Sequence, residues 1–195
     1  GADGVTKMVY RRDLSEQVLR ILLAHGVTTV RNPSAPAEGG VALRDDVARG
    51  LPGPRILTSG EHMNNALMTD EELRAEVRRQ AAVGVDMIKV YASLRPAQVA
   101  TVISEAHSVG LPVVGHLQVT SWTEAARLDI DAITHGAPWT TSYLPAARRA
   151  EYRPSMRGRL DWLEWLDPDG PEITAMIREL AVRRIPVDPT LVTYH

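Results

Sequence analysis

Three residues with chemically useful side chains follow one another along the chain: Lys89, His116 and His135. Lys89 lies within the apolar stretch at residues 87–91, where burying an ammonium group costs roughly several kcal/mol unless the group is paired or neutralised. Of the 22 lysines and arginines, only Lys89 and Lys7 are lysines. A lysine kept at such a position indicates a use that arginine cannot serve.

His116 and His135 each end a short β-branched stretch, PVVGH and DAITH. The intervals between the three residues each fit one strand and one helix, so in a parallel sheet their side chains would meet at one edge. Two neutral imidazoles at such an edge can hold a divalent metal ion, at about 2.0–2.1 Å for zinc. A neutral lysine amine beside them can take up carbon dioxide and become a carbamate, an anionic oxygen ligand able to bridge two metal ions. Arginine, which stays protonated, cannot do this.

Other uses of Lys89 stay open at this point. A buried lysine can be structural, paired with a carboxylate, or it can be a nucleophilic amine that forms a Schiff base with a carbonyl substrate. The alternatives to a metal-dependent hydrolase are therefore a Schiff-base lyase or aldolase that uses Lys89, and a non-catalytic binding protein on the same fold.

The elements that must position these residues repeat a simple unit, in which an amphipathic helix ends at a glycine or turn and a short β-branched strand follows. Capping-box patterns predict helix starts at Asp13, Thr69 and Ser121, and Pro96 suits a first helical position. The predicted helices cover residues 13–26, 69–84, 95–110, 121–130 and 170–184, and the predicted strands cover 27–31, 55–60, 85–92, 111–117, 131–136 and 185–192. This alternation predicts an α/β fold with a parallel sheet covered by helices.

Two observations favour a (β/α)8 TIM-type barrel over a doubly wound sheet. No glycine-rich phosphate loop follows the first strand, where the sequence reads NPSAPAEGG. Polar residues instead recur at the ends of several strands, as barrel enzymes require: Arg31, Glu61, Lys89, His116 and His135. Because a barrel needs eight strands, we expect residues 1–195 to form a partial catalytic barrel domain of about six parallel strands.

Six stretches together resemble the metal-dependent amidohydrolase superfamily, in its imidazolonepropionase-like and dipeptidase-like branch: GVTTVRNPS, PGPRILTSG, GVDMIKVYAS, AHSVGLPVVGH, DAITHG and IPVDPTL. The resemblance covers residues 14–192. It implies a (β/α)8 barrel with one or two divalent metal ions, zinc first and manganese, iron or nickel as alternatives. The implied activity is hydrolysis of an amide or related C–N bond by metal-activated water, in a dipeptide, lactam or cyclic amide.

The resemblance also implies a role for each of the three residues. Lys89 matches the carboxylated lysine that bridges the metals, and His116 and His135 match the metal-binding histidines of barrel strands five and six. Two parts of the family pattern are missing from the sequence, the His-x-His pair of strand one and the aspartate after strand eight. The sequence therefore resembles barrel strands two to seven.

Further candidates surround these three. Tyr91 shares the strand face of Lys89, His62 follows the strand at 55–60, and Trp139 follows DAITH, so we expect all three to bind substrate. The insertion at residues 138–170, after barrel strand six, is either a lid or specificity element or a short helix packed on the barrel through Trp162 and Trp165. Asp188 is a further candidate for a functional residue. We expect four other residues to be structural: His25, His107, Asp86 and Asp131.

Composition narrows the partners. The net charge is −2 and the arginines alternate with carboxylates, which argues against a nucleic-acid partner. The sequence contains no apolar run of about 18 residues and no signal-peptide core, so we expect no membrane partner and a cytoplasmic location. The chain has no cysteine, which excludes disulfides and thiolate metal sites. The expected partner is a small-molecule substrate, and homo-oligomerisation stays open.

Overall fold

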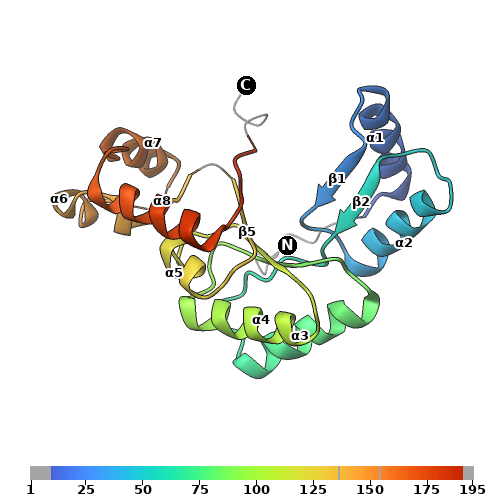
Figure 1. Ribbon diagram of the computed structural model, residues 1–195, viewed down its shortest axis with the longest axis horizontal. Helices are drawn as coiled ribbons and strands as arrows, with labels where there is room; N and C mark the ends of the chain where they lie inside the picture. Colours follow the sequence, from blue (N-terminus) through green and yellow to red (C-terminus); the bar gives the residue numbers. More distant parts are fainter. Residues whose placement is uncertain (1–9, 136, 154, 191–195) are drawn as a thin grey trace.

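In the computed structural model, which describes residues 10–135, 137–153 and 155–190, the chain is an α/β fold with parallel strands (Figure 1). The strands are β1 (Thr29–Asn32), β2 (Arg55–Thr58), β3 (Ile88–Val90), β4 (Val113–Gly115), β5 (Ala132–Thr134) and β6 (Val187–Asp188). β1 pairs with β2, and β3 to β6 form a second sheet in chain order. Two isolated parallel bridges join the sheets, so the six predicted strands form one row.

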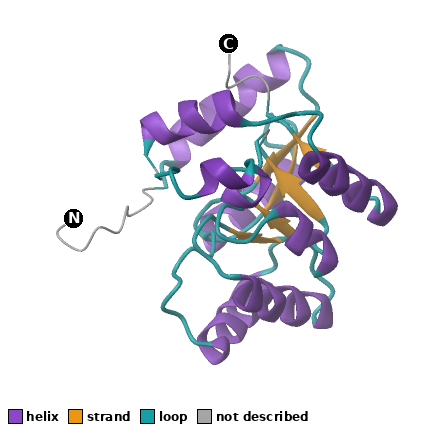
Figure 2. Ribbon diagram, turned by 90° about the vertical axis from the view of Figure 1, so that its left-hand side faces the viewer, coloured by secondary structure: helices purple, strands orange, loops and turns teal. Residues whose placement is uncertain are grey.

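Eight α-helices and a 3-10 helix connect these strands in the described part of the chain. They are α1 (Arg12–Ala24), α2 (Ala37–Ala48), α3 (Asp70–Val83), α4 (Pro96–Ser108), α5 (Trp122–Arg127), η1 (Thr141–Tyr143), α6 (Ala146–Arg149), α7 (Met156–Trp165) and α8 (Pro171–Arg183). Figure 2 shows the helices arranged around the strands. The described strands form an open row and do not close into a barrel.

The helix starts were predicted with one error. The side chains of Thr69 and Ser121 cap α3 and α5 in full capping boxes, and Pro96 opens α4. Asp13, predicted as a cap, instead lies inside α1, which begins after Arg11 and has no side-chain cap. Because the helix begins one residue before Asp13, this side chain lies beyond the capping position. Its carboxylate instead accepts hydrogen bonds from the Arg11 guanidinium.

The two faces of the strands have different neighbours. Ile88, Val90, Val113 and Ile133 point outward and pack with the helices in the main core. On the opposite face Met87, Val114 and Ala132 form a small separate cluster, the innermost layer of the curved sheet. Because side chains alternate along a strand, the next inward position of β3 after Met87 is Lys89.

The insertion at residues 138–170 folds as η1, α6 and α7. Trp162 is fully buried and donates from Nε1 to the backbone oxygen of Thr140 at 2.9 Å, and its ring lies 5.1 Å from that of Trp139. Packing through Trp162 is thus present, while a function as a lid stays a prediction.

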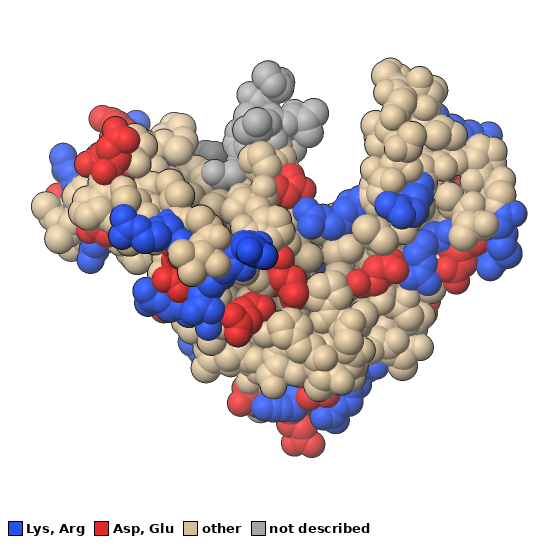
Figure 3. Space-filling view, in the orientation of Figure 1, with Lys and Arg blue, Asp and Glu red and all other residues tan. Residues whose placement is uncertain are grey.

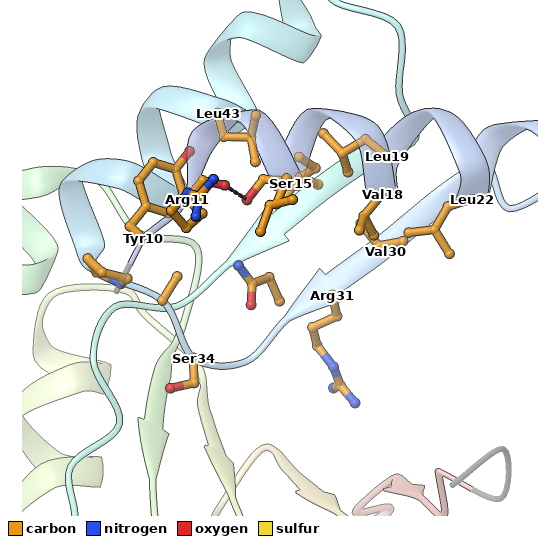
Figure 4. A pocket seen from close by; sticks show the side chains of 15 residues that line it. Tyr10, Arg11, Ser15, Val18, Leu19, Leu22, Val30, Arg31, Ser34 and Leu43 are labelled. Atoms are coloured by element: carbon orange, nitrogen blue, oxygen red, sulfur yellow. Dashed lines mark hydrogen bonds between the residues drawn. The ribbon is translucent and has the colours of Figure 1, made fainter. Parts of the chain in front are cut away.

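The molecule is hollowed between two arms, one formed by α1, α2, β1 and β2 and the other by α6 to α8 (Figures 1 and 3). A cavity of about 680 Å³ lies within the first arm, between α1 and β1, with Arg31 and Ser34 on its edge (Figure 4). Lys89, His116 and His135 do not line it. None of the helices described is long and apolar enough to cross a membrane.

Candidate metal centre

Lys89 is buried on the inner face of β3, with 2% of its surface exposed. Its Nζ donates to Oγ1 of Thr134 on β5, and that hydroxyl donates in turn to the backbone oxygen of Gly115 on β4 at 3.2 Å. Burial, and then the positive charge of Arg31, lowers the pKa of Lys89 to about 8, against a smaller opposing effect of Asp188. Within the described residues no carboxylate forms a salt bridge with this amine. A substantial fraction of it is therefore neutral near pH 8.

His116 and His135 lie side by side at the carboxyl ends of β4 and β5. Their ring centroids are 4.6 Å apart, in an edge-to-face arrangement. Tyr91 stacks on His116 at 4.3 Å between centroids, and the ring of His62 lies 4.6 Å from that of Tyr91. The structure brings the three predicted residues near one another, since Lys89 contacts Thr134, the residue before His135, and its positive charge acts on both imidazoles. Their role as metal ligands stays a prediction.

The position of His135 depends on an unusual backbone. Thr134 faces inward, where its hydroxyl meets Lys89, so regular alternation would turn His135 outward. The backbone of His135 instead has φ +79°, which few residues other than glycine adopt. This conformation ends β5 and allows the imidazole to lie against His116. Strain of this kind in a cluster of polar side chains is a common feature of functional sites.

The imidazoles are held in the neutral form that binds metal ions. Burial, followed by the charges of His135 and Lys89, lowers the pKa of His116 to about 4. The pKa values of His135 and His62 are also lowered, in both cases first by burial and then by Lys89. Nδ1 of His116 is buried and has no hydrogen-bond partner among the described residues. An unpartnered buried ring nitrogen beside a second neutral imidazole fits a metal ligand.

A second set of polar side chains surrounds the first. Arg31 on β1 donates from Nη2 to Oδ2 of Asp188 on β6 at 2.7 Å, although 157 residues separate them. His135 Nδ1 lies 3.1 Å from Oγ1 of Thr190, and His62 Nδ1 lies 2.7 Å from Oγ of Ser34. Sequence reasoning missed Thr134 and Ser34; the inward parity of Thr134, two residues after Ala132, was the available signal.

Other predicted residues lie outside the cluster. The Glu61 carboxylate pairs with Arg79 of α3 at 2.6 Å, so this strand-end residue faces the helices. Trp139 packs against Trp162 and beneath the Arg159 guanidinium, 5.8 Å from its ring, and it does not join the row of His62, Tyr91, His116 and His135. Its contact with substrate stays a prediction.

The side chains expected to be structural make hydrogen bonds with backbone groups. Asp86 accepts a hydrogen bond from the Thr58 amide, and Asp131 accepts one from the Val113 amide and contacts His107. His25 contacts the Ile21 carbonyl near the end of α1. Each carboxylate thus ties the start of one strand to its neighbour.

As a donor set for a metal ion, the cluster is partial. Within the described ranges no group of three His, Asp or Glu side chains is arranged to hold a metal. Two neutral imidazoles are present, and a carbamate on the Lys89 amine would be a third, anionic donor. The residues present therefore fit part of a divalent metal site of the implied kind.

No protein-family model and no curated protein matches the sequence. Solved structures do match the fold. A protein assigned as a prolidase, from Bifidobacterium longum, superimposes with a TM-score of 0.56 and 25% identity, over 73% of this chain and 40% of that one. Bottromycin amidohydrolase superimposes with a TM-score of 0.55 and 24% identity, over 71% and 33% of the two chains.

A further amidohydrolase has a TM-score of 0.54 at 15% identity, over 92% of this chain and 59% of that one. The resemblance to amidohydrolases is confirmed at the level of the fold. The predicted α/β fold with parallel strands is confirmed, and the matched structures are TIM-barrel proteins. The imidazolonepropionase-like branch stays a prediction. The chain spans between 33% and 59% of the length of these three amidohydrolase-type structures.

Proposed function

We propose that the protein is a metal-dependent hydrolase of an amide or related C–N bond, with Lys89, His116 and His135 at its metal centre. The observation that carries this proposal is a pair of imidazoles with centroids 4.6 Å apart, near a buried lysine amine whose charge acts on both of them. Similarity in fold to a prolidase-type protein and to amidohydrolases supports a hydrolase of this broad kind.

The chemistry available to Lys89 follows from its surroundings. Burial favours the neutral amine, whose lone pair can attack carbon dioxide. An N–C bond forms, one C–O π pair moves onto oxygen, and the nitrogen gives a proton to solvent water, so that an N-carboxylated lysine with an anionic end results. Thr134, which holds Nζ through its hydroxyl, would position this group between β3 and β5.

The imidazoles would hold the metal ion through neutral nitrogens. Tyr91, stacked on His116 at 4.3 Å, restricts the rotation of that ring, and Thr190 contacts the ring of His135. A bound divalent metal ion lowers the pKa of a water molecule and polarises a carbonyl oxygen. His62 and Tyr91, which continue the row of rings outward, would then contact the substrate beside the reacting bond, with Trp139 further out.

Elemental analysis and unfolding of the purified protein test this proposal. We expect zinc or manganese to bind stoichiometrically and to raise the melting temperature, because a ligand that binds only the folded state stabilises it. His116→Ala and Lys89→Arg should lose both effects, whereas His25→Ala, which changes an exposed histidine directly after α1, should retain them.

Activity is then measured on dipeptides, N-acyl amino acids and lactams with the metal-loaded protein. Hydrolysis that depends on metal and is lost in His116→Ala is the expected result. The pKa of about 8 at Lys89 also suits a nucleophilic amine. Covalent trapping of a carbonyl compound on Lys89 by borohydride, in a protein that binds no metal, would replace the hydrolase by a Schiff-base lyase.

A further inference from the structure

We propose that Arg31 binds an anionic group of the substrate, a carboxylate. The inference deepens the proposed function, on which it depends only for the identity of the reacting bond. It assigns the substrate to the class of amides that carry a free carboxylate.

Arg31 faces the site and not the helices. Its neighbour Val30 packs with Leu19, Leu43 and Ile56 in the small core between α1, α2 and β2, so alternation turns Arg31 to the inner side of β1. Figure 4 shows its guanidinium pointing away from α1. Its charge acts on Lys89 and on His135, which places it within electrostatic reach of both.

One nitrogen of the Arg31 guanidinium, Nη2, has a hydrogen-bond partner, and the other two can still donate to a ligand. Nη2 contacts Oδ2 of Asp188, and the other carboxylate oxygen accepts the backbone amide of Thr190 at 3.0 Å. Among the described residues no acceptor contacts Nε or Nη1 of Arg31. The Arg31 side chain is 29% exposed, so a ligand can reach it. A guanidinium presents a planar fork of N–H donors that matches a carboxylate, and here one arm is fixed and the remainder is not.

The charges around the site favour an anion. Arg31 acts on His135 and Arg159 acts on His116 with positive charge, and Asp188 is the carboxylate that acts against Arg31 at His135. Lys89 adds a third positive charge only while its amine is protonated and not carboxylated. Glu61, the other acidic residue at a strand end, pairs with Arg79 away from the cluster. A substrate carboxylate would offset an excess of positive charge that the protein itself leaves uncompensated.

Two matched probes test this inference, first by binding and then by kinetics: N-acetyl-L-alanine, which carries a carboxylate, and N-acetyl-L-alaninamide, which does not. Their affinities are measured by calorimetry on the metal-free protein, and then by KM on the loaded enzyme where it hydrolyses them. The variants are Arg31→Met, Arg31→Lys and Asp188→Asn. Arg55→Met is the control, because it removes an exposed arginine from the opposite end of the neighbouring strand.

We expect the wild type and Arg55→Met to bind the acid on the order of 10- to 100-fold more tightly than the amide. Arg31→Met should abolish this preference and Arg31→Lys should keep part of it. Asp188→Asn should keep or increase it, because the guanidinium loses a competing carboxylate while the Asn oxygen can still accept the Thr190 amide. A purely structural ion pair predicts the opposite, equal losses in Arg31→Met and Asp188→Asn.

The inference is overturned if the wild type does not distinguish acid from amide, or if Asp188→Asn loses the preference together with Arg31→Met. Should Arg31→Met fail to fold, the comparison of Asp188→Asn with Arg31→Lys decides. A preference for the acid without metal-dependent hydrolysis would refute the proposed function alone, and hydrolysis without the preference would refute the role of Arg31 alone.

Discussion

Lys89→Met should stabilise the protein at neutral pH when metal and carbon dioxide are absent. The pKa of the buried amine is about 8, against 10.5 for an ordinary lysine. At about 1.36 kcal/mol per pKa unit, charging this amine at pH 7 costs the folded state about 3 kcal/mol. Methionine has a similar length and no charge, and Thr134 keeps its hydrogen bond to Gly115. We therefore expect a gain of about 2–3 kcal/mol in the free energy of unfolding.

The sign of the pH dependence follows from the same values. Between about pH 8 and pH 10.5 the unfolded chain binds more protons at Lys89 than the folded chain does, so wild-type stability rises with pH across this window. The Met variant lacks this contribution. Its advantage over the wild type should be full at pH 7, shrink above pH 8 and vanish near pH 10.5.

The assay is denaturant unfolding at pH 7, 8, 9 and 10, followed by the fluorescence of the four tryptophans, in degassed buffer with a chelator. Lys89→Arg serves as the comparison, since a guanidinium stays charged throughout and should destabilise at every pH. The prediction fails if Lys89→Met is no more stable than the wild type at pH 7, or if its advantage is independent of pH. Either result would show that burial does not lower the pKa of this amine.

Three further predictions concern stability. His135→Gly should be more stable than His135→Ala by about 1 kcal/mol in the unfolding free energy, because φ +79° strains any residue with a Cβ; equal stabilities would contradict a left-handed backbone there. Trp162→Phe should lower the unfolding free energy by about 1 kcal/mol, because the hydrogen bond to Thr140 is lost. Trp162→Ala should lower it by about 3–5 kcal/mol, and a much smaller loss would mean that α7 is not packed on the core. Ser121→Ala should lower the melting temperature through about 1 kcal/mol of lost capping at α5, whereas Ser104→Ala, within α4, should not.

The sequence predicted the elements well where local signals were strong. All six strands form, and α3, α4 and α5 begin where their capping residues or proline indicated. It missed α2, because Gly39 and Gly40 lower helix propensity. The structure gives a reason for one of them, since a Cβ at Gly40 would approach the Thr58 hydroxyl to 2.6 Å. A glycine is therefore required at position 40 by a contact with β2, and helix propensity along the sequence carries no information about that contact.

The candidate site was predictable in part for the same reason. Alternation along β3 and β4 puts Lys89 and His116 on the inner face, which the sequence alone allows one to state. The pair of Arg31 and Asp188 depends on the curvature of the whole sheet, which brings strands 157 residues apart within a hydrogen bond. No short-range pattern reports on that curvature.

Burial is the first cause of the low pKa at Lys89, His116, His135 and His62 alike. Excluding water disfavours the charged form of every base in the cluster, which leaves neutral nitrogens that can bind a metal ion and an amine that can react. It also raises the cost of each positive charge that remains, since nearby charges are then poorly screened. The environment that makes the imidazoles good ligands therefore makes the site attract anions, and an anionic substrate group and an anionic Lys89 carbamate would both lower the same electrostatic cost.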